Sequence, residues 1–171
     1  DNGTISDVAG NNATLTHSPV SDNSSYKVDT TPPTISSVTA GWGTYLNATE
    51  DDSAGTVTVV TSGAENGQTV TVTLNSTNYT GTVSDNSTAV TVAASGLQAL
   101  TDGDNYTLTT NVSDAAGNAA TVNTGTSFTY DRTPPSISGA VAITSATGIQ
   151  NNLLNAGDNV SVTVTFSENS P

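Results

Sequence analysis

The side chains in this sequence that could do chemistry are carboxylates and amides, and they recur beside repeated motifs. Asp29 opens the sequence Asp-Thr-Thr-Pro-Pro, and Asp131 opens Asp-Arg-Thr-Pro-Pro 102 residues later (131 − 29). The turn motif Asp-x-Ala-Gly-Asn also occurs twice, starting at Asp7 and at Asp114. Oxygen atoms of Asp, Asn and Glu are the ligands that Ca²⁺ takes in proteins. These positions are therefore candidates for binding Ca²⁺.

A third repeated motif adds further oxygen ligands after each Pro-Pro pair. It reads Asn-Ala-Thr-Glu from Asn47 to Glu50 and Asn-Ala-Gly-Asp from Asn155 to Asp158. Self-similarity at a fixed period indicates tandem domains. The residues predicted to bind Ca²⁺ are Asp7, Asn11, Asp29, Asn47, Glu50, Asp102, Asp114, Asn118, Asp131, Asn155 and Asp158.

The repeated motifs divide the chain into one complete unit and two incomplete ones. We expect residues 1–31 to be the C-terminal part of a preceding repeat, 32–133 to be a complete repeat, and 134–171 to be the N-terminal part of a following repeat. About 100 residues are enough for a domain with its own core. Pro-Pro cannot continue a strand ladder, so each pair predicts a short, stiff joint. We expect the sequence to be cut from a longer array.

The elements that must position these side chains are strands, because short apolar–polar alternations are separated by turn residues. Seven strands in about 100 residues predict an all-β chain in which immunoglobulin-like β-sandwiches follow one another head to tail. Tyr106, at the entry to the sixth strand, is typical of a tyrosine corner. No window has a helical period. The strands are expected at 34–40, 56–62, 68–74, 78–84, 88–94, 105–113 and 119–130, with another near 159–166 and one ending at Tyr26 and Val28.

The topology of a seven-stranded sandwich sorts the acidic residues between its two ends. The loop after the first strand, the loop before the sixth and the end of the seventh share one end, called here the C-terminal pole. That end should gather Asn47, Glu50, Asp51, Asp52, Asp102, Asp104 and Asp131. Asp114 and Asn118 should lie at the opposite end, near Asp29. Crowded carboxylates repel one another, and Lys27 and Arg132 supply only one positive charge beside each joint, so Ca²⁺ is the expected remedy.

Composition excludes several other classes of function. The chain has 2 basic and 15 acidic residues, for a net charge of −13, which argues against nucleic-acid binding. It has no Cys, and no apolar run approaches the length of a membrane span. His17 has no catalytic companions and is expected to be an exposed residue. With no nucleophile elbow or phosphate loop, the sequence does not predict an enzyme.

The motifs together resemble the immunoglobulin-like repeats of giant, type I-secreted bacterial surface adhesins. The matching segments are 45–50, 66–75, 97–103, 113–118, 162–168 and the Asp-Thr-Thr-Pro-Pro joint. The resemblance implies an extracellular rod at the bacterial cell surface, with Ca²⁺ at the joints between neighbouring repeats of one polypeptide. An adhesive domain elsewhere in the full protein would then bind the ligand, for cell adhesion or biofilm formation. Arg132, where a small residue is usual, could form an ion pair that competes with metal.

Two alternative functions belong to other classes. The incomplete units could pair between copies by strand donation, which would make the chain a subunit of an extracellular filament. Trp42, flanked by two glycines, could instead present an aromatic face to a carbohydrate. Sugar binding requires Trp42 to be exposed in a groove, whereas a structural role requires it to be buried.

Overall fold

The computed structural model describes residues 4–14 and 25–167, which fall into two units divided after Thr30. The first unit contains a turn closed by a bridge between Ser6 and Asn12. His17 and most of the strand expected before Tyr26 lie outside the described residues. Tyr26 and Val28 themselves belong to no strand and are exposed, so the predicted end of that strand is wrong. A strand needs a neighbour, and no described segment pairs with them.

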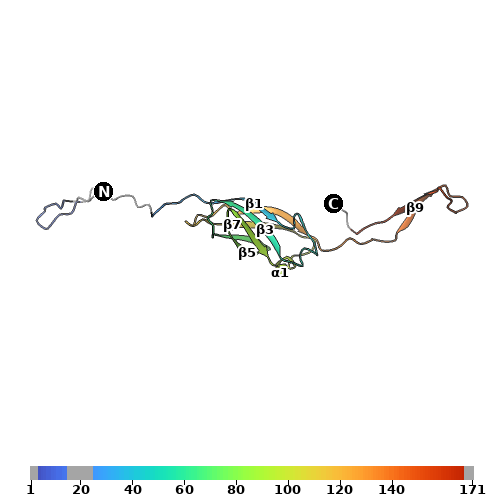
Figure 1. The fold of residues 1–171 in the computed structure, drawn as a ribbon, viewed down its shortest axis with the longest axis horizontal. Coiled ribbons are helices and arrows are strands. Elements are labelled where there is room, and N and C mark those ends of the chain that lie inside the picture. The colour runs from blue at the N-terminus through green and yellow to red at the C-terminus, as the bar shows by residue number, and fades with distance from the viewer. Residues whose placement is uncertain (1–3, 15–24, 168–171) are drawn as a thin grey trace. The chain divides into compact units, whose positions relative to one another are not determined.

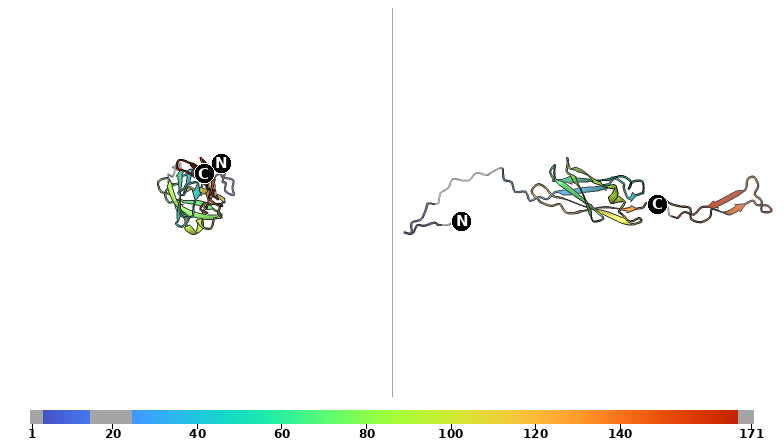
Figure 2. Two further views of the ribbon diagram at one scale, coloured as in Figure 1. Left: turned by 90° about the vertical axis from the view of Figure 1, so that its right-hand side faces the viewer. Right: turned by 90° about the horizontal axis from the view of Figure 1, so that it is seen from below.

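Residues 34–130 form a β-sandwich, which confirms the predicted fold class (Figure 1). One sheet has the order β1-β3-β6 and the other β2-β8-β7-β4-β5, and every pairing is antiparallel except β2 with β8. Figure 2 shows the two layers from the side. The strands are β1 (Thr34–Ala40), β2 (Tyr45–Leu46), β3 (Gly55–Ser62), β4 (Thr69–Leu74), β5 (Thr77–Thr82), β6 (Ser87–Val92), β7 (Asn105–Val112) and β8 (Asn123–Tyr130).

Three local features differ from the sequence-based expectation or extend it. β5 pairs with β4 because Asn75 and Ser76 form a two-residue turn, both with positive φ, which holds consecutive strands side by side. The two residues of β2 are too few to show an alternation. The helix α1 (Ala94–Leu97) contradicts the expectation of no helix, since one turn is too short to produce a period.

The core lies between the two sheets and follows the predicted alternation. Val57 and Val59 of β3 are fully buried, as are Val70 and Val72 of β4. The intervening positions carry mostly Thr, which suits a solvated pleat. None of the eight strands of the sandwich contains a charged residue, so its charges lie entirely in the loops.

Trp42 belongs to this core. Its side chain is 8% exposed, and its ring meets the Phe128 ring edge-on with centroids 5.2 Å apart. Gly55 leaves the necessary space, because a Cβ there would lie 2.6 Å from the Trp42 ring. The burial expected for a structural role of Trp42 is confirmed. The exposed ring that carbohydrate binding requires is not present.

Tyr106 forms the predicted tyrosine corner. Its hydroxyl accepts a hydrogen bond from the Thr101 N–H at 2.7 Å, and its ring lies 6.0 Å from that of Phe128. The bond ties the loop that carries Asp102 to the start of β7. The corner therefore helps to position one of the candidate metal ligands.

We expect Tyr106→Phe to lower the free energy of unfolding by about 1 kcal/mol, because the Thr101 N–H loses its partner while the ring stays packed. Urea denaturation followed by fluorescence measures the change. Tyr45→Phe is the matched control, since Tyr45 is 53% exposed. Equal stability of both variants would show that the corner contributes nothing.

Residues 136–167 contain a two-stranded antiparallel ribbon of β9 (Ala142–Thr147) and β10 (Asn159–Thr163). β10 falls within the strand predicted near 159–166, whereas β9 was not predicted. Leu153, Leu154 and Phe166 are at least half exposed. Two strands cannot bury a core by themselves, which accounts for this exposure. Within the described ranges no helix is long and apolar enough to cross a membrane.

Candidate metal-binding loops

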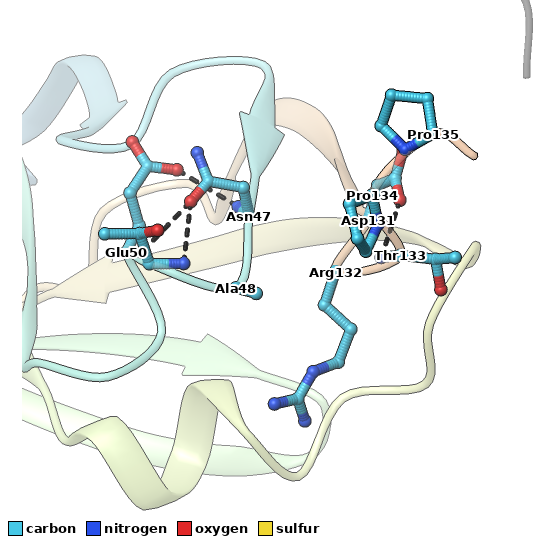
Figure 3. Close-up of a pocket in the computed structure, with 9 residues that line it drawn as sticks. Asn47, Ala48, Glu50, Asp131, Arg132, Thr133, Pro134 and Pro135 are labelled. Carbon is cyan, nitrogen blue, oxygen red and sulfur yellow. Dashed lines mark hydrogen bonds between the residues drawn. The ribbon is translucent and has the colours of Figure 1, made fainter. Parts of the chain in front are cut away.

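The C-terminal pole brings together three of the predicted ligands. Asn47, Glu50 and Asp131 line a pocket of about 520 Å³, together with Arg132 and the first joint residues that follow it (Figure 3). The parallel pairing of β2 with β8 makes this possible, since the Asp131 N–H donates to the Leu46 carbonyl at 2.9 Å. The loop after the first strand and the end of the last strand therefore meet, as the topology predicted.

The Asn47–Glu50 turn holds its own side chains in place. The Asn47 amide oxygen accepts the N–H groups of Thr49 (2.9 Å) and Glu50 (3.1 Å), and the Glu50 carboxylate accepts the Asn47 N–H at 3.1 Å. Asn155 and Asp158 repeat the pattern, because the Asp158 carboxylate accepts the Asn155 N–H at 2.6 Å. Two positions of the sequence repeat thus share one local structure.

Asp102 connects the loop before β7 to the outgoing linker. Its carboxylate accepts the Arg132 N–H at 2.8 Å and the Thr133 hydroxyl. The hydrogen bond from the Thr133 hydroxyl is the main reason that the pKa of Asp102 lies below its usual value of 3.8. Asp131 accepts the Thr133 N–H at 3.2 Å. Both carboxylates therefore help to hold the linker.

The opposite pole holds Asp114 and Asn118 in one turn. The two oxygens of Asp114 accept the Asn118 N–H at 2.8 Å and its amide group at 2.9 Å. Asp7 and Asn11 repeat these bonds at the same distances. Glu65, which was not among the predicted site residues, accepts the Ala115 N–H at 2.8 Å. Its place in the loop before β4, at the same pole, was the signal that could have identified it.

We expect the protein to lose stability as the pH falls below about 4. Hydrogen bonds from Asn118, Thr133 and Asn11 lower the pKa values of Asp114, Asp102 and Asp7 in the folded state. The unfolded chain therefore takes up protons first, and stability present above pH 3.8 is lost as the pH falls through the folded pKa values.

Urea midpoints measured between pH 5 and pH 2.5 test this expectation. Asp114→Asn should flatten the dependence, because it removes one of the three carboxyl groups whose pKa is lowered in the folded state. A midpoint that stays constant over this range would contradict it.

The predicted crowding of carboxylates at the C-terminal pole is not found within the sandwich. No three His, Cys, Asp or Glu side chains in the described part of the chain form a group that could hold a metal ion. The carboxylates are kept apart by local hydrogen bonds, because Glu50 accepts the Asn47 N–H within its own turn and Asp102 accepts the Thr133 hydroxyl. Asp29 is exposed in the first unit, and its proximity to Asp114 stays a prediction.

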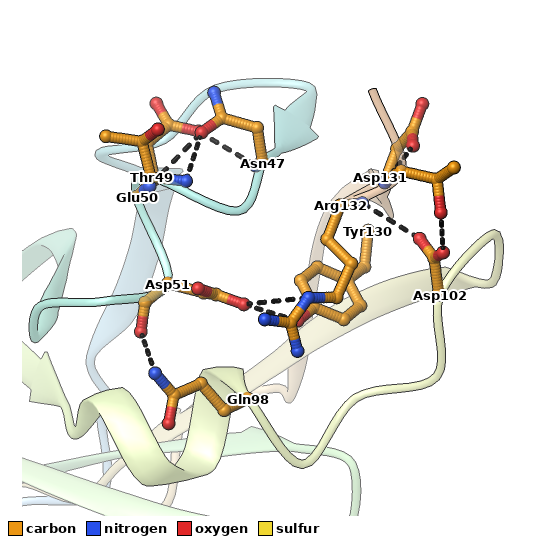
Figure 4. A network of polar contacts seen from close by, with 10 residues as sticks. Asn47, Thr49, Glu50, Asp51, Gln98, Asp102, Tyr130, Asp131 and Arg132 are labelled. Atoms are coloured by element: carbon orange, nitrogen blue, oxygen red, sulfur yellow. Dashed lines mark hydrogen bonds and ion pairs between the residues drawn. The ribbon is translucent and has the colours of Figure 1, made fainter. Parts of the chain in front are cut away.

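Asp51, which was predicted to join the acids gathered at the C-terminal pole, has a different environment from its neighbour Asp52. It is fully buried, accepts a hydrogen bond from the Tyr130 hydroxyl and lies 3.9 Å from Nε of Arg132 (Figure 4). Burial, together with this hydrogen bond, raises the pKa of Tyr130 above 10.0. The ion pair anticipated for Arg132 is therefore present, and it forms with an interior acid.

No protein-family model matches the chain, and no curated protein does. Among solved structures, a Ca²⁺-stabilized adhesin that helps an Antarctic bacterium reach out and bind ice is 31% identical, over 95% of this chain and 39% of that chain, with a TM-score of 0.52. A bacterial immunoglobulin-like domain from the M. primoryensis ice-binding adhesin is 33% identical, over 56% of this chain and 96% of that domain, with a TM-score of 0.41. The chain thus spans about two fifths of the length of the first.

Proposed function

We propose that this chain is a spacer in a rod that Ca²⁺ stiffens at the joints. The chain belongs to the family of bacterial immunoglobulin-like repeats found in large surface adhesins, and this membership is the starting point of the proposal. The chain's place is the bacterial cell surface, and its role is mechanical, with no catalytic step. Residues 32–133 would be one whole spacer, with residues 1–31 and 134–171 belonging to its neighbours. The rod would hold an adhesive domain, located elsewhere in the full protein, away from the cell for adhesion or biofilm formation.

The observation that carries this proposal is the distribution of charge. Every acid between residues 32 and 133 lies in a loop, and every strand of the sandwich is uncharged. Loops that link antiparallel strands lie at the two ends of a sandwich. Head-to-tail stacking would then set acidic ends against each other, where like charges repel. A divalent cation between them would relieve the repulsion.

The residues at the C-terminal pole suit Ca²⁺ by type. Asn47, Glu50 and Asp131 offer amide and carboxylate oxygens at one pocket, and Ca²⁺ takes six to eight such ligands in flexible geometry. These three are too few by themselves. Main-chain carbonyls, water and the facing loop of the next repeat would supply the rest. That facing loop corresponds to the turn from Asp114 to Asn118 in this repeat, with Glu65 beside it. Bound Ca²⁺ would neutralise the carboxylates and limit bending.

A calcium titration of the whole chain tests the proposal. At about ten times the dissociation constant, Ca²⁺ adds roughly 1.4 kcal/mol per site. We therefore expect the melting temperature to rise by about 5–10 °C. Small-angle scattering should show a longer particle, and a chelator should reverse both changes. Equal concentrations of Mg²⁺, which demands tighter octahedral geometry, serve as the control. If Ca²⁺ changed neither the melting curve nor the scattering curve, the proposed role of the metal would be wrong, and only tandem β-sandwich domains without metal at their joints would remain.

A second candidate function is a filament joined by strand donation, which the exposed apolar side chains of residues 137–166 favour. Ile143, Leu153 and Phe166 are each more than half exposed. A strand from another copy could cover them. Size-exclusion chromatography at several concentrations separates the two functions, since a monomer at all of them disfavours donation and a growing polymer supports it.

A further inference from the structure

We propose that buried Asp51 anchors a clamp that fixes residues 130–133, the root of the outgoing linker, to the sandwich without metal. Arg132 is the counter-ion that the buried carboxylate requires. The clamp lies beneath the pocket at the C-terminal pole and uses none of the residues predicted there as ligands for its central ion pair. It therefore does not depend on the proposed role of Ca²⁺.

The main chain of the linker root is bonded residue by residue. Four consecutive N–H groups donate to acceptors at this pole, and the next two residues are prolines, which have no N–H. The bonds run from Tyr130 to the Asp104 carbonyl (3.0 Å), from Asp131 to the Leu46 carbonyl (2.9 Å), from Arg132 to Asp102 (2.8 Å) and from Thr133 to Asp131 (3.2 Å). The linker is thus held as far as Thr133.

Asp51 lies under this segment and is fully buried. One of its carboxylate oxygens accepts the Tyr130 hydroxyl and lies 3.9 Å from Arg132 Nε. The other is buried and has no hydrogen-bond partner among the residues that the structure describes. Gln98, just after α1, holds the main chain by donating to the Asp51 carbonyl at 3.1 Å. A buried carboxylate without a nearby positive charge is strongly unfavourable, so Asp51 requires Arg132.

The repeated motifs show that neither charge is required by the motif in which it stands. At the first joint, Thr30 stands where Arg132 stands at the second. In the following repeat, the motif that starts at Asn155 puts Asn159 where Asp51 lies. Each of the two charged positions is neutral in the neighbouring motif. The ion pair is therefore not a fixed part of either repeated motif, and in this sequence both of its positions can be compared only within the repeat of residues 32–133.

Hydrogen exchange at residues 131–133, measured in a chelator, tests the clamp. Arg132→Thr gives the second joint the residue that the first joint has. It should raise the hydrogen exchange of the main-chain amides at positions 132 and 133 about tenfold, and it should lower the melting temperature by about 5 °C. Asp51→Asn should raise the same exchange. The double variant should be no worse than Arg132→Thr alone, because it leaves no unpaired buried charge. Asp52→Asn, one residue away and exposed, is the matched control and should change neither quantity.

Unchanged exchange in both single variants, or losses that simply add in the double variant, would overturn the proposal. If Arg132→Thr does not fold, Arg132→Lys replaces it, since lysine keeps the charge without the planar guanidinium. Arg132→Lys should then give a smaller rise in exchange at the same amides than is expected for Arg132→Thr. If Arg132→Lys gave no rise in exchange, that result would count against the clamp. Because every measurement contains a chelator, failure of the calcium titration leaves the result intact.

Discussion

Replacing Trp42 with alanine is expected to lower the free energy of unfolding of the complete repeat by about 3–5 kcal/mol. The side chain is 8% exposed and meets Phe128 edge-on. Gly55 packs beneath the ring, so truncation leaves a cavity bordered by backbone that cannot readily collapse. Urea denaturation followed by circular dichroism measures the loss.

A matched control comes from Tyr45, which is 53% exposed and, as the first residue of β2, lies only three positions from Trp42. Tyr45→Ala should cost less than about 1 kcal/mol. Gly55→Ala probes the same packing from the other side, since its Cβ would meet the Trp42 ring at 2.6 Å. We expect it to destabilise by about 1–3 kcal/mol. A stable Trp42→Ala variant that lost affinity for a glycan would instead favour the carbohydrate-binding function.

Most of the fold could be predicted from the sequence because its signals are local. Alternation of Val with Thr placed β3 and β4 to within one residue at each end. The sheet to which a strand belongs was harder to predict. The turn at Asn75 and Ser76 decides that β5 pairs with β4, and only its positive φ values reveal this. One-turn α1 and two-residue β2 are shorter than any period that a sequence can show.

The candidate site was less predictable, because burial of a loop residue depends on distant partners. Asp51 and Asp52 are adjacent and identical, yet the first is fully buried and the second exposed. Tyr130, 79 residues further along the chain, makes the difference by donating its hydroxyl to Asp51. Asn47 and Asn155 were recognised as equivalent positions of a repeated motif and predicted to bind Ca²⁺, and in the structure both motifs share one local hydrogen bond. A repeated Asn–Glu or Asn–Asp motif is therefore explained as well by a shared hydrogen-bonded turn as by a shared metal ligand.

The double variant Glu50→Gln and Asp131→Asn is expected to abolish the response to Ca²⁺. Both carboxylates line the pocket at the C-terminal pole, and the substitutions remove two negative charges while keeping the shape of each side chain. Gln can still accept the Asn47 N–H through its amide oxygen, so the turn should persist. The rise in melting temperature on adding Ca²⁺ should fall from about 5–10 °C to less than about 1 °C.

Asp52→Asn removes a charge from the same loop without touching the pocket, so it should keep the full Ca²⁺ response and serves as the matched control. In a chelator the double variant should be at least as stable as the parent chain, because it carries less repulsion at the pole. If it were instead strongly destabilised without Ca²⁺, the two acids would be structural residues of the loop.

A double variant that still responded fully to Ca²⁺ would place the ion elsewhere. The acidic turn from Asp114 to Asn118, at the opposite pole, would then be the next position to substitute.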